Sequence, residues 1–273
     1  MLEGIRVVAI ATNIPAPVAA ARFLALGASV TKIEPLRGDP LEEGSAQWYR
    51  EITSGMEALR LDLRARQARA LIGERLRDAD LLITAMRARA LANAELDGQH
   101  LRARYPRLCS VTLFGEAPPH DDRAGHDLTY QARAGTIAPP VMPRALVGDM
   151  AAAERVVSTG LALLLQRERT GEAASASVAI TDAAADFAKP FEYGLTRGDG
   201  QLGGGLPVYD LYQARDGWIA LAALEPHFIA RLQSMLGLET LERDTLAAAF
   251  ARHTAQEWET LAQQHDLPLA AVR

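Results

Sequence analysis

Cysteine is nearly absent from this sequence: Cys109 is its single cysteine in 273 residues. One cysteine cannot form a disulfide within the chain, nor can it build a metal site of several thiolates. Because proteins that stay reduced are typical of the cytoplasm, we expect a cytoplasmic protein. The six histidines are scattered without metal-ligand spacing, so the sequence predicts no metal site.

An excess of positive charge and a long apolar run are also missing. The 29 Lys and Arg residues are outnumbered by 34 Asp and Glu residues, which gives a net charge of −5. Nucleic-acid-binding domains usually carry a basic surface instead. The most apolar stretch, residues 156–165, is interrupted by Ser158 and Gly160 and is shorter than the ~18 residues of a membrane span. The N-terminus has no basic lead of the kind that begins a signal peptide. We therefore expect no nucleic-acid partner and no membrane partner.

The common nucleotide-binding and hydrolase motifs are absent as well. The first strand–helix connection, residues 12–15, has no glycine, so the dinucleotide fingerprint is missing where it would hold a pyrophosphate. There is no P-loop, no G-x-S-x-G elbow and no H-E-x-x-H motif. These absences disfavour hydride transfer, ATP hydrolysis, serine hydrolysis and zinc catalysis.

The composition is typical of globular proteins, with 49% hydrophobic and 23% charged residues. A length of 273 residues is enough for one large domain or two modest ones. Short apolar runs alternate with helical patterns, which predicts an α/β fold with a mostly parallel sheet covered by helices. Predicted strands cover residues 5–11, 28–34, 59–63, 80–84, 108–113 and 174–180. Predicted helices follow Pro15, cover 66–77, and begin near His126 and at Asp149.

A second, smaller α+β domain is predicted after a glycine-rich segment at residues 194–205. Two apolar runs flank Asp216-Gly217, which is a strong hairpin signal. Three helical patterns follow, and the last begins with a capping box formed by Thr254 and Glu257. We therefore divide the chain into residues 1–200 and 201–273.

Three short segments carry candidate functional residues: Gly125-His126-Asp127, Gly148-Asp149-Met150 and Leu224-Glu225-Pro226. Each also has a plain structural interpretation. Asp149 can act as a helix cap, His126 can bond the backbone at a helix start, and Glu225 can be a solvated carboxylate before a proline. Taken singly, none of them establishes a site.

Taken together with other motifs, these segments resemble CoA-transferase family III, which includes formyl-CoA and carnitine-CoA transferases and 2-methylacyl-CoA racemases. The resemblance covers nearly the whole chain, and the motifs within residues 206–228 are most similar to the racemase branch. The motifs occur in the family's order: Ile5-Arg6-Val7-Val8, Lys32-Ile33-Glu34-Pro35, Gly38-Asp39-Pro40, Leu61-Asp62-Leu63, Tyr105-Pro106-Arg107-Leu108, Gly125-His126-Asp127-Leu128, Gly148-Asp149, Arg167-Glu168-Arg169-Thr170-Gly171, Leu206-Pro207-Val208-Tyr209-Asp210 and Ala223-Leu224-Glu225-Pro226-His227-Phe228.

The resemblance implies a Rossmann-like large domain that binds coenzyme A as an acyl-CoA substrate. In the racemases, the residues matching His126 and Asp149 flank C2 of the acyl chain, and one removes the proton that the other returns. In the transferases, the residue matching Asp149 is the nucleophile that attacks the thioester. The residue matching Glu225 supports the aspartate. Because a transferase needs no base at position 126, His126 favours racemase-like chemistry.

The resemblance also implies phosphate contacts and an assembly. Arg37, Arg60 and Arg87 are the candidate CoA-binding residues, although each can also be an ordinary surface arginine. Family members form interlocked homodimers, so we expect a dimer. Their C-terminal segment returns to the large domain, and we expect that this segment is missing here.

Three functions stay open from the sequence. The first is epimerisation of C2 of an acyl-CoA through an enolate, with His126 and Asp149. The second is CoA transfer to a carboxylate, with Asp149 as nucleophile. The third is CoA binding without chemistry, which is motivated by two departures from the family pattern: Ala145 replaces an asparagine, and Met56-Glu57 replaces a basic pair.

Overall fold

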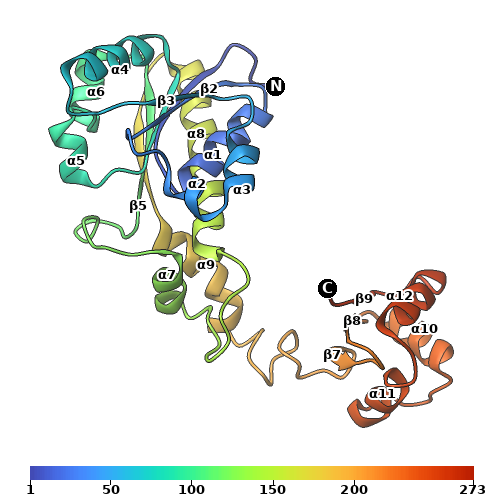
Figure 1. Ribbon diagram of the computed structural model, residues 1–273. Helices are drawn as coiled ribbons and strands as arrows, with labels where there is room; N and C mark the ends of the chain where they lie inside the picture. Colours follow the sequence, from blue (N-terminus) through green and yellow to red (C-terminus); the bar gives the residue numbers. More distant parts are fainter. The chain divides into compact units, whose positions relative to one another are not determined.

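The computed structural model describes residues 1–273, which form two compact units, residues 1–188 and 189–273 (Figure 1). The boundary comes earlier in the chain than residue 200, and helix α9 (Ile180–Glu192) explains its position. The buried residues of α9 end at Ala188, Pro190 lies inside the helix, and most of the residues that follow are exposed. The glycine-rich segment therefore belongs to the second unit.

The first unit is built on a parallel sheet of six strands in the order β3-β2-β1-β4-β5-β6. This sheet confirms the predicted α/β fold. Strand β3 ends before residue 63 because the Asp62 side chain accepts the Arg64 N–H at 3.0 Å and turns the chain. The strands are β1 (Arg6–Ile10), β2 (Ser29–Glu34), β3 (Glu57–Arg60), β4 (Leu81–Thr84), β5 (Cys109–Phe114) and β6 (Ser175–Ala179).

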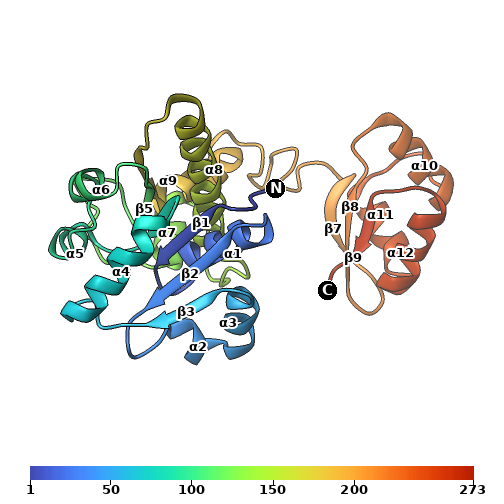
Figure 2. The same ribbon diagram turned by 90° about the horizontal axis from the view of Figure 1, so that it is seen from above.

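Helices cover both faces of this sheet (Figure 2). Helices α1, α3 and α8 contribute to the hydrophobic cluster on one face, and α4, α5 and α6 to the cluster on the other. The helices before α9 are α1 (Pro15–Ala25), α2 (Pro40–Gly44), α3 (Ala46–Thr53), α4 (Arg66–Asp78), α5 (Ala88–Asn93), α6 (Gly98–Arg104), α7 (Asp127–Ala134) and α8 (Val147–Thr170).

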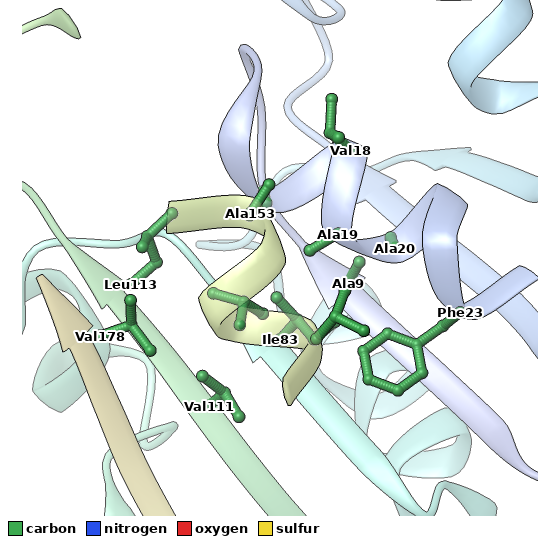
Figure 3. Packing of buried hydrophobic residues seen from close by; sticks show 14 of the residues in the cluster. Ala9, Val18, Ala19, Ala20, Phe23, Ile83, Val111, Leu113, Ala153 and Val178 are labelled. Carbon is green, nitrogen blue, oxygen red and sulfur yellow. The ribbon is translucent and has the colours of Figure 1, made fainter. Parts of the chain in front are cut away.

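The core between α1, α8 and the sheet is packed with small residues (Figure 3). Ala19 and Ala20 of α1 are fully buried beside Phe23, so the helix backbone approaches the sheet closely. Gly160 lies within α8 because a Cβ there would be 2.8 Å from the Phe23 ring and 2.9 Å from a Leu81 methyl group. This packing fixes α8, whose first turn carries Asp149.

The second unit is an α+β fold with an antiparallel sheet in the order β7-β8-β9. The predicted hairpin and the Thr254–Glu257 capping box are both present. The third strand, β9, was not predicted. The elements are β7 (Tyr209–Gln213), β8 (Trp218–Ala222), α10 (Pro226–Leu236), α11 (Arg243–Phe250), α12 (Ala255–Gln264) and β9 (Leu269–Ala271). None of the chain's helices combines the length and the apolarity required to cross a membrane.

Candidate active site

A pocket of about 250 Å³ lies in the first unit, at the carboxyl ends of β1, β4 and β5. The chain leaves β1 toward β2 on one side and later returns to β4 on the other side. The loops after β1 and β4 therefore diverge, and a crevice at such a switch point is where open α/β sheets bind ligands. The pocket is lined by Thr12, Asn13, Pro15, Ala85, Met86, Arg87, Leu113, Phe114, Gly115, Asp121, Arg123, Ala124, Gly125, His126, Tyr130, Asp149 and Ile180.

Two of the predicted catalytic residues, His126 and Asp149, line this same pocket. Each lies at a helix N-terminus. His126 is the residue that caps α7, and Asp149 is in the first turn of α8, two residues after the helix begins at Val147. Asp149 is therefore not the helix cap, because Leu146 occupies that position. A role as a helix cap therefore does not explain why an aspartate stands at position 149.

The backbone of His126 is held by Thr129. The Thr129 hydroxyl accepts the His126 N–H at 3.1 Å and donates to the His126 carbonyl at 2.8 Å. The start of α7 thus has a capping partner of its own. The imidazole is exposed and lines the pocket.

The carboxyl group of Asp149 has unusual proton affinity. Burial, and secondarily the negative charge of Asp127, raise the pKa of Asp149 to about 7. A carboxyl group with this pKa exists in both protonation states near neutrality. It can therefore accept a proton and also return one at ordinary cellular pH.

Asp127 is a residue of the site that sequence reasoning missed. It is buried, and its Oδ1 accepts the backbone N–H of Asp149 at 2.9 Å, while its Oδ2 contacts Gln131 Nε2. Gln131 Nε2 also donates to the carbonyl of Ala145 at 2.9 Å. Asp127 therefore supplies the side-chain cap that Leu146 lacks and joins the N-termini of α7 and α8.

Gly148 makes this contact possible. A Cβ at this position would lie 3.1 Å from Asp127 Oδ1 and 3.2 Å from a methyl group of Ile180. A larger residue would push Asp127 away from the first turn of α8. The close approach of Asp127, at the start of α7, thus explains why a glycine precedes Asp149.

Tyr130 is the second residue that the sequence did not reveal. It is buried, lines the pocket, and its phenol group fills the space beside Gly115 and Gly125, where any Cβ would collide with the ring. Burial and the charge of Asp149, followed by that of Glu116, raise the pKa of Tyr130. Its hydroxyl therefore stays protonated and can act as a hydrogen-bond donor.

The candidate CoA-binding arginines are distributed unevenly. Arg87 lines the pocket, together with Arg123, which was not predicted. Arg60 does not line it and instead binds Glu42, with its Nε 3.5 Å from Glu34 Oε2. Arg37 is exposed in the connection between β2 and α2.

Glu225 belongs to the second unit, where it is the exposed residue that precedes α10. The chain has no cluster of three His, Cys, Asp or Glu side chains arranged to hold a metal ion.

The raised pKa of Asp149 gives a prediction about stability. The folded protein holds this proton more tightly than the unfolded chain, whose Asp has a pKa near 3.8. The contribution of protonated Asp149 is therefore complete at low pH and is lost as the pH rises toward 7. Asn resembles protonated Asp and does not titrate. The difference in unfolding free energy between Asp149→Asn and the parent protein should therefore shift in favour of the variant by about 2–3 kcal/mol when the pH rises from 5 to 8. Urea unfolding at both pH values measures this difference, and a constant difference would contradict the assigned pKa.

The pocket thus brings His126 and Asp149 together with Arg87 and Arg123 at the switch point of an open α/β sheet. The chain matches the model of CoA-transferase family III over residues 2–273, and it belongs to this family. The resemblance stated from the motifs is thus confirmed. Members of the family are racemases or CoA-transferases, so the protein is an enzyme of one of these kinds.

Relatives with both kinds of activity are similar to this chain. Alpha-methylacyl-CoA racemase of Mus musculus is 28% identical over 289 residues, which is 94% of this chain and 74% of the relative. Cinnamoyl-CoA:phenyllactate CoA-transferase of Clostridium sporogenes is 26% identical over 324 residues, which is 100% of this chain and 78% of the relative. The crystal structure of a hypothetical protein of Mycobacterium tuberculosis is 25% identical with a TM-score of 0.84, covering 99% of this chain and 83% of that protein.

Proposed function

We propose that this enzyme epimerises C2 of an acyl-CoA thioester. The observation that supports the proposal is the meeting of His126 and Asp149, from the N-termini of two different helices, in one pocket at the switch point of the sheet. Such a reaction needs two acid–base groups whose pKa values are near neutrality. Histidine is the side chain that most often performs such proton transfers, and burial raises the pKa of Asp149 to about 7.

The proposed reaction has two proton transfers. One of the two groups removes the proton from C2, and the electron pair of that C–H bond moves into the thioester carbonyl to give an enolate. The other group then donates a proton to the opposite face of C2, and the electron pair returns to form the new C–H bond. Tyr130, neutral beside Asp149, is a donor available to the enolate oxygen.

Arg87 is the proposed partner for the phosphates of CoA at the pocket, and Arg37 and Arg60 are proposed to extend this contact at the neighbouring strand ends. A supporting role for Glu225 is proposed on the motif Leu224-Glu225-Pro226 alone.

The experiment is incubation with single epimers of a 2-methylacyl-CoA in deuterated water. We expect deuterium at C2 together with inversion of configuration, read by mass spectrometry and chiral chromatography of the released acid. CoA binding in calorimetry without exchange, across a panel of acyl chains, would overturn the proposal and favour a binding protein.

CoA transfer to a free carboxylate is the second candidate, and the printed activities of several relatives favour it, among them succinate–glutarate CoA-transferase of Agrobacterium fabrum. In this reaction Asp149 attacks the thioester and CoA leaves as a thiolate. A pKa of about 7 leaves about half of Asp149 protonated at pH 7, which suits a proton shuttle better than a nucleophile. Hydroxylamine trapping of an acylated Asp149 during turnover would favour transfer.

We also propose that two copies of the chain form a homodimer. Large apolar side chains are exposed on and after α9, where Phe187 is 63%, Phe191 49% and Tyr193 81% exposed. Large apolar side chains exposed this close together along one segment are typical of surfaces that another chain covers. Sedimentation should give a dimer, and Phe187→Asp should shift it toward the monomer. Leu165→Asp, at a similarly exposed position of α8 (59%), is the matched control and should remain dimeric.

A further inference from the structure

The motif Lys32-Ile33-Glu34 forms a buried ionic network at the end of β2, apart from the catalytic pair. Lys32 and Glu34 have no exposed side-chain surface, and Lys32 Nζ contacts both Glu34 Oε1 and, at 2.7 Å, Asp39 Oδ2. Glu34 Oε1 also accepts the Tyr49 hydroxyl at 2.8 Å. Burying an ammonium group is costly unless carboxylates surround it, as they do here.

Asp39 connects this network to the chain around it through its other oxygen. Its Oδ1 accepts two backbone N–H groups, from Leu41 at 3.0 Å and from Asn13 at 2.8 Å. The contact with Leu41 caps helix α2. The contact with Asn13 reaches across to the turn between β1 and α1.

This turn forms part of the pocket wall. Thr12 and Asn13 line the pocket that contains His126 and Asp149. Asn13 has a φ of 68°, a left-handed conformation that costs energy for a residue with a side chain. Ile14 occupies the N-cap position of α1, but its side chain makes no capping hydrogen bond. The hydrogen bond from the Asn13 N–H to Asp39 is therefore the side-chain restraint on this turn.

We propose that Asp39, held in place by Lys32, is a positioning residue that fixes the Asn13 turn in the shape that receives the acyl-CoA. The proposal rests on the proposed function of the pocket. Asp39 acts through the backbone of Asn13 and takes no part in proton transfer. Losing the restraint should therefore weaken substrate binding more than it slows the chemical step.

Asp39→Asn tests the restraint with almost no change of volume. Asp39 presents acceptor oxygens on both sides, to Lys32 and to two backbone N–H groups. An amide has one acceptor oxygen, so the variant must turn an NH₂ group toward one set of donors. We expect KM to rise about tenfold, with kcat changed less than about threefold, and amide hydrogen exchange to rise in a peptide covering residues 11–16.

Asp97→Asn is the matched control. Asp97 caps α6 by accepting the backbone N–H groups of Gln99 and His100, and it does not line the pocket. The same substitution there should leave both KM and the exchange of residues 11–16 unchanged. A KM effect of equal size in the two variants, or Asp39→Asn with parental exchange in this peptide, would overturn the proposal.

A second pair of variants acts on the turn without touching the buried charges. Asn13→Gly and Asn13→Val both remove the amide, but a β-branched residue is strained at positive φ and glycine is not. We expect KM to be about tenfold higher in Asn13→Val than in Asn13→Gly, and equal values would contradict the proposal. Hydrogen exchange of residues 11–16 needs no turnover, so it tests the restraint even if the reaction differs from the one proposed.

Discussion

Replacing Asp149 with Asn should abolish inversion at C2, with a loss of about three orders of magnitude in rate. The amide keeps the size of the side chain but can neither accept nor donate the proton that moves between C2 and the carboxyl group. Positioned acid–base groups contribute about 10²- to 10⁴-fold to such reactions. Deuterium exchange and chiral analysis, started from each epimer separately, measure the loss.

The same variant should separate the two proton transfers. The epimer whose C2 proton faces His126 can still be deprotonated, so it should exchange deuterium with retention of configuration. The epimer whose proton faces Asp149 should not exchange. Inversion of either epimer at a tenth of the parental rate or more would remove Asp149 from the mechanism.

Glu154→Gln is the matched control for this experiment. Glu154 is an acidic residue of the same helix, it is exposed, and its partner is Arg22 at 2.9 Å. It does not line the pocket. The control should therefore keep the parental rate of inversion, because replacing an acidic residue of α8 outside the pocket leaves the two proton transfers intact.

The parallel sheet could be predicted because its signals are local. Strands such as β1 and β4 are short apolar runs buried on both faces, and β1 is followed by the proline-led helical pattern of α1. Strand β9 has three residues and no such signal, because it forms only by pairing with β8, where Leu221 lies opposite Leu269. Helix α9 was missed because it begins at Ile180 directly after β6, so its first residue reads as the last apolar residue of the predicted strand 174–180.

Some residues of the candidate site could likewise be predicted from the sequence, and others could not. His126 and Asp149 could be named because the short motifs that contain them occur, with others, in the order of a known family. The role of Asp127 could not, since it depends on the N-termini of α7 and α8 lying side by side. Nor could the role of Tyr130, because its pocket-facing position depends on a glycine in the connection after β5. Tertiary neighbours, rather than sequence neighbours, define these two residues.

Replacing His126 with Asn should give the mirror image of the Asp149 result. Inversion should again fall by about three orders of magnitude, but now the epimer whose C2 proton faces Asp149 keeps exchanging with retention. The carboxyl group has a pKa of about 7 and needs its ionised form to remove the proton. This residual exchange should therefore rise as the pH increases to 7 and level off above it.

The His126 variant also decides between the two candidate functions. In CoA transfer the thioester is attacked by Asp149 and no proton leaves C2, so His126 has no chemical step to perform. Hydroxylamine trapping of Asp149 and transfer to an added carboxylate, both measured in His126→Asn, would then establish transfer and contradict the racemase proposal. Loss of inversion with retained exchange of one epimer, and no trapped Asp149, is the result that a two-base pocket requires.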